Sequence, residues 1–408
     1  MRLVGNRPAP TARILLTPDR RILLALFAIA FGLRVLYAAT VGLAGDIAPD
    51  PRTYDFRTAE SIYSSFAWIS EPFTPKAPGY ILALAALMRV FGTGVWVALL
   101  FNAFLGAAAT FFMYRIGERK LGQGVGLLAA IWLGLYLHHI HSAAVISRDV
   151  LVVFLWLWIL HVSTQFLHNF RSAMWLGLLY TVLIHVEPMF VLVFPVFIIG
   201  FALFTRRDRA RGIQSAVLFA ATVCVLCIPW MARNYVVYRE PIPISLEATR
   251  YTGSLGRMFD TSNVDTRDVS REAGQTPGAP GFAHNSVEFW RVVRLSDAPG
   301  NPHLGIRPEP AWSTRHNLIN LISFGVLLPF LIAGCAIGRQ RRNLSALALM
   351  GAMTTWWVVR GFVGADERSR LPVEPIVILL AIYGAMRLVA RLRARRRDSA
   401  ASSSDAAG

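Results

Sequence analysis

Long apolar runs alternate with short, arginine-bearing polar segments along most of the 408-residue chain. Several runs reach the ~20 residues that an α-helix needs to cross the hydrocarbon core of a bilayer. The pattern therefore predicts an all-α, polytopic helical membrane protein with about ten transmembrane helices. In chain order, the predicted spans are residues 22–43, 79–114, 122–138, 149–166, 173–186, 189–204, 213–232, 316–338, 344–360 and 371–390. The second range is too long for one straight span, so its first part, Gly79–Phe91, is expected to be a separate tilted or interfacial segment.

Composition supports a membrane location. Apolar residues make up 55% of the chain and charged residues only 16%, whereas a soluble protein carries about 25% charged residues. The first run, 22–43, is longer than the apolar region of a signal peptide and has no small-residue cleavage site. We therefore expect it to stay in the protein as a membrane anchor.

The formal net charge of +17 could indicate nucleic-acid binding, but the positions of the basic residues favour another explanation. If both termini lie on one side of the membrane, almost all of the excess arginine falls on that side, including the cluster Arg387–Arg397. Cytoplasmic loops of multi-pass proteins carry such an excess. The sequence thus predicts cytoplasmic termini, outward-facing loops at 44–78 and 233–315, and no nucleic-acid partner. The arginine-rich composition also suggests a bacterial inner membrane.

The same pattern divides the chain into three parts. Residues 1–21 form a cytoplasmic N-terminal tail, 22–390 form one integral membrane domain that carries both outer loops, and 391–408 form a basic cytoplasmic tail with a disorder-prone end. In the first outer loop, Asp50 and Pro51 form an N-cap followed by proline at the first helical position. We therefore expect this loop to carry a short interfacial helix along the membrane surface.

The first outer loop also holds the strongest candidate for acid–base chemistry. The capping role alone explains Asp50, but a carboxylate at a membrane-facing cavity could equally take a proton from an acceptor hydroxyl. Tyr54 lies one helical turn further on and would face the same side. Asp46 and Asp55 are further carboxylates that could support Asp50, bind a divalent metal ion or lie in solvent.

Basic residues on the predicted outer face suggest anion binding. Lys76 is one of only two lysines in the chain, and it could either snorkel to the headgroup region or place a point charge on a phosphate. Arg368 and Arg370 precede the last span on the same face, where arginine is disfavoured, although the acidic residues just before them could simply neutralise them. Arg233 follows the seventh span, among aromatic residues typical of an interfacial belt.

Three other groups are weaker candidates. Glu187 lies between two spans, where an acidic group is costly without a partner, so it could serve a site. His138 and His141 would share a helix face, but the spacing fixes no third metal ligand, and interfacial histidines are common. Cys224 and Cys227 have C-x-x-C spacing inside a predicted span, where packing explains them better than redox chemistry or metal binding.

Five short motifs follow one another on the predicted outer face. They are Asp50-x-x-x-Tyr54-Asp55, Lys76-Ala-Pro-Gly-Tyr80, Ser147-x-Asp149, Pro229-Trp230-x-x-Arg233-Asn234-Tyr235 and Arg368-x-Arg370-Leu371-Pro372-x-x-Pro375. This succession resembles the bacterial membrane glycosyltransferases of the GT-C class, the relatives of protein O-mannosyltransferases and of the lipid A aminoarabinose transferase. The Ser-x-Asp motif stands where that class usually has Ser-x-Glu, and Ser369 stands where its arginine motif commonly has a tyrosine.

The resemblance implies a GT-C-like fold and an enzyme that moves a sugar from a polyprenyl-phosphate carrier to a hydroxyl acceptor on the outer face. It implies Asp50 as the general base, and it implies that Lys76, Arg368 and Arg370 hold the carrier phosphate as it leaves. Supporting roles follow for the remaining candidates: Asp46, Tyr54, Tyr80, Glu187 and Arg233. The acceptor could be a lipid, a glycan or a protein.

Two other classes of function remain open. One is a transporter or lipid flippase, and the other is a non-enzymatic assembly protein or a polysaccharide polymerase. Transporters typically have paired halves with polar groups at the middle of the membrane. Here the charged residues gather at the outer ends of the predicted spans, and the sequence has no detectable repeat. A polymerase would share the lipid-linked substrate but need not use Asp50 or Lys76.

Overall fold

The computed structural model describes residues 20–42, 53–65, 76–163, 170–204, 209–239, 242–245, 282–296, 311–363 and 368–405. Within these ranges the regular secondary structure is entirely helical, so the all-α prediction is confirmed. The elements are α1 (Arg20–Tyr37) with the π-helical turn η2 (Ala38–Gly42), α2 (Tyr54–Ser65), α3 (Pro78–Phe91), α4 (Val95–Lys120), α5 (Gln123–Leu135), α6 (Leu137–Ala143), α7 (Asp149–Ser163), α8 (Phe170–Val186), α9 (Phe190–Phe204), α10 (Arg209–Tyr238), α13 (Phe282–Trp290), α14 (Thr314–Asn320) with η7 (Leu321–Gly325), α15 (Leu327–Gln340), α16 (Leu344–Val363), the 3₁₀ turn η8 (Arg368–Arg370) and α17 (Glu374–Asp405).

Several described helical segments are long and apolar enough to cross a membrane. The five that meet this criterion are Arg20–Val41, Val95–Lys120, Ala210–Tyr238, Thr314–Gln340 and Glu374–Arg397. A sixth would form if α5 and α6, which meet at a bend of 51°, act as one broken span. Helices α3, α7, α8 and the first part of α9 are apolar but shorter. The multi-pass prediction is confirmed, whereas the number of about ten spans stays a prediction.

The predicted long span at 79–114 is divided into two helices. α3 ends at Phe91, and Gly92 follows with a φ of 88°, a conformation that glycine adopts without a steric penalty. α4 then begins at Val95. The expected separate segment is therefore a helix of its own, and it packs against α2 and α8.

The short helix predicted in the first outer loop is present as α2, which begins at Tyr54. Its inner face is apolar and buried, with Phe56, Ala59 and Ile62 packed in the core. Thr53 is not helical, and its carbonyl accepts from the Arg57 N–H at 3.1 Å, so the predicted helix start at Pro51 with Asp50 as the cap is wrong. Asp50 and Asp46 themselves lie outside the described residues.

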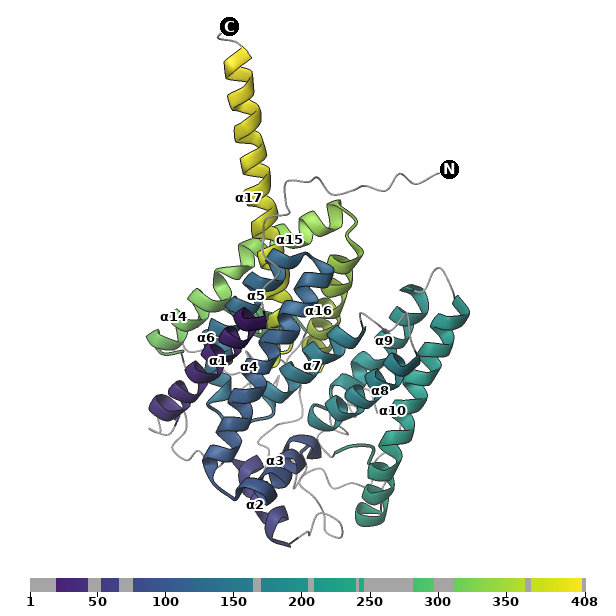
Figure 1. The fold of residues 1–408 in the computed structure, drawn as a ribbon. Helices are drawn as coiled ribbons and strands as arrows, with labels where there is room; N and C mark the ends of the chain where they lie inside the picture. Colours follow the sequence, from purple (N-terminus) through teal and green to yellow (C-terminus); the bar gives the residue numbers. More distant parts are fainter. Residues whose placement is uncertain are drawn as a thin grey trace.

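The helices pack around α4, which contacts α1, α5 and α7, while α17 packs against α15 and α5. Figure 1 shows α8, α9 and α10 grouped on one side of the bundle, and α2 and α3 at the end opposite to the free end of α17. α17 continues as a helix to Asp405, through a serine- and alanine-rich stretch whose composition is typical of a disordered tail.

Glycine allows a very close contact between α15 and α17. A Cβ atom at Gly334 would collide with the backbone of Leu380, and one at Gly384 would collide with the backbone of Phe330. Small residues at such positions let membrane helices approach each other closely. This contact fixes α17 against the bundle, and with it the turn η8 that directly precedes α17.

A buried arginine stabilises the bend between α5 and α6. The Arg34 side chain is completely buried in α1, and its guanidinium donates to the carbonyls of Ala30, Leu133 and Gly134 at 2.9 to 3.2 Å. The last two carbonyls belong to the final turn of α5, where carbonyls lack the i+4 donor of a regular helix, and that of Leu133 also accepts from the N–H of Tyr136, the residue after the helix. The cation therefore compensates the partial negative charge at that helix end.

Candidate active site

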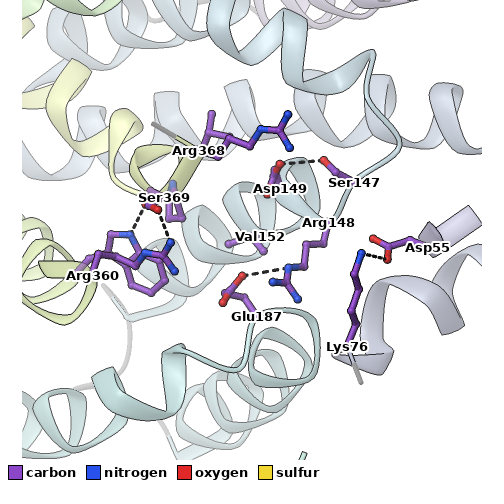
Figure 2. Close-up of a pocket in the computed structure, with 13 residues that line it drawn as sticks. Asp55, Lys76, Ser147, Arg148, Asp149, Val152, Glu187, Arg360, Arg368 and Ser369 are labelled. Atoms are coloured by element: carbon purple, nitrogen blue, oxygen red, sulfur yellow. Dashed lines mark hydrogen bonds and ion pairs between the residues drawn. The ribbon is translucent and has the colours of Figure 1, made fainter. Parts of the chain in front are cut away.

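A charged cavity of about 330 Å³ lies where α2, the segment before α3, the start of α7, the end of α8, the end of α16 and η8 come together (Figure 2). Its lining residues are Asp55, Lys76, Ser147, Arg148, Asp149, Val152, Glu187, Trp356, Arg360, Arg368, Ser369, Leu371 and Pro372. Four of these side chains are basic and three are acidic. The excess of cations in a concave, partly enclosed site favours an anionic ligand.

The first wall of the cavity comes from α2 and the residues before α3. The Lys76 ammonium lies 3.0 Å from Asp55 Oδ1 and 4.7 Å from the centre of the Tyr54 ring. The lysine side chain is 45% exposed and that of Asp55 is 12% exposed, so the carboxylate holds the cation at the edge of the cavity. The structure thus brings together Lys76 and Tyr54, two of the predicted site residues.

The second wall is formed by the turn before α7. The Ser147 hydroxyl donates to Asp149 Oδ2 at 3.0 Å, in the first turn of α7, where the helix dipole stabilises a carboxylate. Arg148 Nε lies 3.2 Å from Glu187 Oε2, and this ion pair links the turn to the end of α8 (Figure 2). Glu187, a predicted supporting residue, therefore lines the cavity with Arg148 as its partner.

Tyr80 supports this turn from behind. Its buried hydroxyl donates to Asn102 Oδ1 at 3.2 Å, and Asn102 Nδ2 donates to the carbonyl of Val145 at 2.9 Å. From the other direction, the hydroxyl of Thr53, just before α2, donates to the carbonyl of Ile146 at 2.9 Å. These bonds hold the backbone that leads into α7. Tyr80 does not line the cavity but stabilises the turn that forms its second wall.

The third wall consists of η8 and the end of α16. Arg360 donates to the hydroxyl of Ser369 and contacts Met189 Sδ at 2.6 Å. Trp356 Nε1 donates to the carbonyl of Ser369 at 2.7 Å, which fixes η8 against α16. The Arg368 side chain extends from η8 toward the start of α7 (Figure 2).

Arg370 points away from this cavity although it follows Arg368 by two residues. Its guanidinium is completely buried and donates to Glu374 Oε1 at 2.8 Å, to Asn320 Oδ1 at 3.1 Å and to the carbonyl of Arg291 at 2.8 Å. These bonds tie the start of α17 to α14 and to the segment after α13. The structure therefore separates two arginines that the sequence places in one motif.

The two arginines are expected to respond differently to replacement. Arg370→Ala leaves the buried carboxylate of Glu374 without its guanidinium, and breaking a buried pair in this way costs about 3–5 kcal/mol. Arg368→Ala removes an exposed side chain and should leave stability unchanged while it lowers activity. Thermal unfolding in detergent would measure the stability of each variant. Equal melting temperatures for the two variants would contradict the structural role of Arg370.

Arg233 lies on α10 and organises the segment that follows this helix. It donates to Asn234 Oδ1 at 3.0 Å and stacks over the Trp230 ring at 5.2 Å. Asn234 Nδ2 donates to the carbonyl of Ile242 at 3.0 Å, and Trp230 Nε1 donates to that of Ile244 at 2.7 Å. Arg233 is not among the described residues that line the cavity.

Metal binding finds little support among the described residues. Within them, no group of three or more His, Cys, Asp or Glu side chains could hold a metal ion. His138 lies 2.9 Å from Glu374 Oε1, and His141 lies 3.1 Å from the Tyr37 hydroxyl, so the two histidines make separate contacts. A divalent ion stays a prediction. Of the two carboxylates named for it, Asp55 pairs with Lys76 and Asp46 lies outside the described residues.

Sequence reasoning does not single out two of the four cavity cations. Arg148 occupies the unspecified position of the Ser147-x-Asp149 motif. The motif is explained by the start of a helix, which assigns no role to Arg148. Arg360 is the only charged residue in α16. An arginine in an apolar membrane helix is costly unless it faces a polar cavity, and this signal could have identified Arg360.

Comparisons with known proteins agree with this architecture. The model of the dolichyl-phosphate-mannose-protein mannosyltransferase family matches residues 75–232, which include Lys76, Asp149 and Glu187. No curated protein matches the chain. The archaeal oligosaccharyltransferase AglB from Archaeoglobus fulgidus, in complex with an inhibitory peptide and a dolichol-phosphate, superposes with a TM-score of 0.57 at 13% identity, over 94% of this chain and 51% of AglB. ArnT from Cupriavidus metallidurans, bound to undecaprenyl phosphate, superposes with a TM-score of 0.56 at 16% identity, over 87% of this chain and 60% of ArnT.

The chain therefore has the fold of the GT-C class membrane glycosyltransferases. The resemblance drawn from the five motifs is confirmed at the level of the fold. The chain spans about half to three-fifths of the length of the two structures it matches.

Proposed function

We propose that this protein is a glycosyltransferase that moves a hexose or pentose from a polyprenyl-phosphate carrier to a hydroxyl acceptor. The observation that carries the proposal is the cavity with four cations, Lys76, Arg148, Arg360 and Arg368, within a GT-C fold. An isoprenoid phosphate is a membrane lipid with an anionic head group, and the four cations of the cavity are suited to bind such a head group. The similar structures of AglB and ArnT contain dolichol-phosphate and undecaprenyl phosphate, which supports this donor class.

In the proposed reaction, Asp50 takes the proton of the acceptor hydroxyl as the hydroxyl oxygen attacks the anomeric carbon of the sugar. The bond between that carbon and the phosphate oxygen breaks, and polyprenyl phosphate leaves with the electron pair. Lys76 and Arg368 stabilise the charge that develops on the leaving phosphate. Arg370 serves this step indirectly, because its buried bonds position η8 and hence Arg368.

Chain connectivity supports Asp50 as the base. Thr53 is bonded to the backbone of Ile146, next to Ser147 in the cavity wall. Asp50 precedes Thr53 by three residues, a stretch of at most about 11 Å. The choice of Asp50 rests on this short connection to the cavity wall, because Asp46 is four residues more distant along the chain.

We further propose that the cavity faces the outer side of a bacterial inner membrane and that both termini are cytoplasmic. The arginine-rich turn after α15 and the arginine-rich end of α17 meet through a 2.9 Å bond from Arg391 to Gln340, whereas the cavity adjoins the opposite, N-terminal end of α17. Such an accumulation of arginine at one end supports a cytoplasmic position for that end. The domain division at residues 1–21, 22–390 and 391–408 follows from this topology.

Transfer of labelled sugar tests the proposed function. Purified full-length protein is incubated with labelled polyprenyl-phosphate sugars and with membrane extract as the acceptor source. Label is expected to move from the donor into the lipid, glycan or protein fraction, with release of polyprenyl phosphate, and heat-denatured protein serves as the control. Movement of intact donor across vesicle membranes without a new glycosidic bond would favour a flippase instead.

A further inference from the structure

The end of α17 carries a high density of positive charge. This helix continues past the rest of the bundle (Figure 1), and its segment 387–397 contains six arginines and no acidic residue. The turn after α15, residues 339–342, adds three arginines and again no acidic residue. Of these side chains only that of Arg387 is half-buried, and the others are exposed. The proposed topology explains on which side of the membrane the arginines lie, but it does not explain their arrangement.

Helix packing directs one face of α17 toward this turn. Gly384 lies on the face of α17 that packs directly against α15. Arg391, two turns further on, donates to Gln340 at the end of α15 at 2.9 Å. Because an α-helix has about 3.6 residues per turn, residues at intervals of four from these positions share the same face. Three arginines do so and form an arginine stripe: Arg387, Arg391 and Arg395.

The arginine stripe therefore lies beside the turn that carries the other three arginines, and cations from two segments meet. The bond that joins the segments runs from Arg391 to the neutral amide of Gln340, so it compensates no charge. Like charges that lie close together raise the energy of the folded state, and a bound anion would remove this repulsion. A guanidinium can bind two oxygens of a phosphate at once, so a phosphate group suits several converging arginines.

This basic surface lies at the end of two candidate membrane spans. The spans are Thr314–Gln340 and Glu374–Arg397, and the bond between Arg391 and Gln340 joins their ends. A bilayer core takes about 20 residues, so a span that begins with α17 leaves the core near Arg393. Both arginine segments are therefore expected at the depth of the lipid head groups. Next to these arginines in the chain, Leu344 and Leu392 are 67% and 59% exposed, where a lipid chain would cover them.

We infer that the arginine stripe and the turn 339–342 together bind the phosphate head group of an anionic phospholipid. Charge complementarity selects an anion, and the depth of the site and the exposed leucines select a lipid over a soluble acidic partner. Basic clusters at the end of a membrane span bind anionic head groups in this way. The site is at the opposite end of α17 from the charged cavity. The inference uses no feature of sugar transfer, so it stands or falls separately from the proposed function.

Binding of phosphatidylglycerol to the purified full-length protein in detergent tests the inference, and native mass spectrometry would count the bound lipids during a titration. Replacement of the arginine stripe by glutamine is expected to weaken this binding about tenfold or more, because each arginine near the head group adds to the attraction. The variant carries Arg387→Gln, Arg391→Gln and Arg395→Gln. Phosphatidylcholine with the same acyl chains has no net charge and should bind the wild type more weakly than phosphatidylglycerol.

The same helix end offers a matched control. Three further arginines of α17 lie on its other faces, and their replacement removes the same charge from the same segment: Arg393→Gln, Arg396→Gln and Arg397→Gln. This triple variant should bind phosphatidylglycerol like the wild type. Lysine in place of the three stripe arginines should retain most of the affinity, since the charge is kept. Thermal unfolding verifies that each variant is folded, and the lysine variant replaces the glutamine variant if the latter is destabilised.

Three results would overturn the inference. Unchanged affinity for phosphatidylglycerol in the stripe variant would show that the stripe binds no head group. Equal weakening in the stripe variant and the control variant would mean a diffuse attraction by the whole helix end rather than a site. Equal binding of phosphatidylcholine and phosphatidylglycerol by the wild type would exclude selection by charge.

Discussion

Asp50→Asn is expected to reduce sugar transfer by about 10²–10⁴-fold, the usual contribution of a positioned general base, while donor binding is retained. Asparagine has nearly the shape of aspartate but cannot accept the proton of the attacking hydroxyl. The donor contacts assigned to Lys76 and Arg368 are not altered by this change. Initial transfer rates measured beside the affinity for the polyprenyl-phosphate donor would separate the two effects.

Asparagine also keeps the shape of the Asp50 side chain and its ability to accept backbone hydrogen bonds. Since α2 begins only at Tyr54, the change lies outside the helix, and lost activity would not be attributed to a lost helix cap. Asp46→Asn is the matched control and should retain most of the transfer rate. Full activity in Asp50→Asn together with inactivity in Asp46→Asn would move the base to Asp46.

Lys76→Gln is expected to lower the transfer rate by about 100-fold or more, comparable with the removal of one donor that stabilises a developing negative charge. The ammonium lies at the cavity edge, 3.0 Å from Asp55, and in the proposed reaction it stabilises the leaving phosphate. Single-turnover transfer rates at saturating donor would measure this effect on the chemical step rather than on binding.

Lys120→Gln is the natural control, because Lys120 is the only other lysine in the chain and lies at the end of α4. It should behave like the wild type. Asp55→Asn should give an intermediate loss, because it removes the carboxylate that holds Lys76 but keeps the cation. Wild-type transfer by Lys76→Gln would mean that the lysine only snorkels to the headgroup region, and this outcome would falsify its catalytic assignment.

Local sequence patterns were sufficient to predict the fold class and the division of the chain into helical segments. Apolar runs near the length of a bilayer core predicted a multi-pass helical protein, and the long range at 79–114 predicted a separate first segment that the structure has as α3. The number of spans could not be derived in the same way. Apolar helices of 15 to 17 residues such as α7 and α8 have a composition that suits both a short span and a helix buried within the protein.

The sequence by itself determined the helical membrane class, the order of the five motifs and the candidate residues Lys76, Glu187 and Arg368 that line the cavity. Only the tertiary structure decided that Arg370 leaves the cavity for a buried cluster, since the turn η8 directs residues two apart to different surroundings. It also brought Arg360 from α16 to a cavity that includes Asp55 of α2. Residues so far apart in the chain meet only through helix packing. Because packing depends on all the interacting helix surfaces together, no short stretch of sequence predicts it.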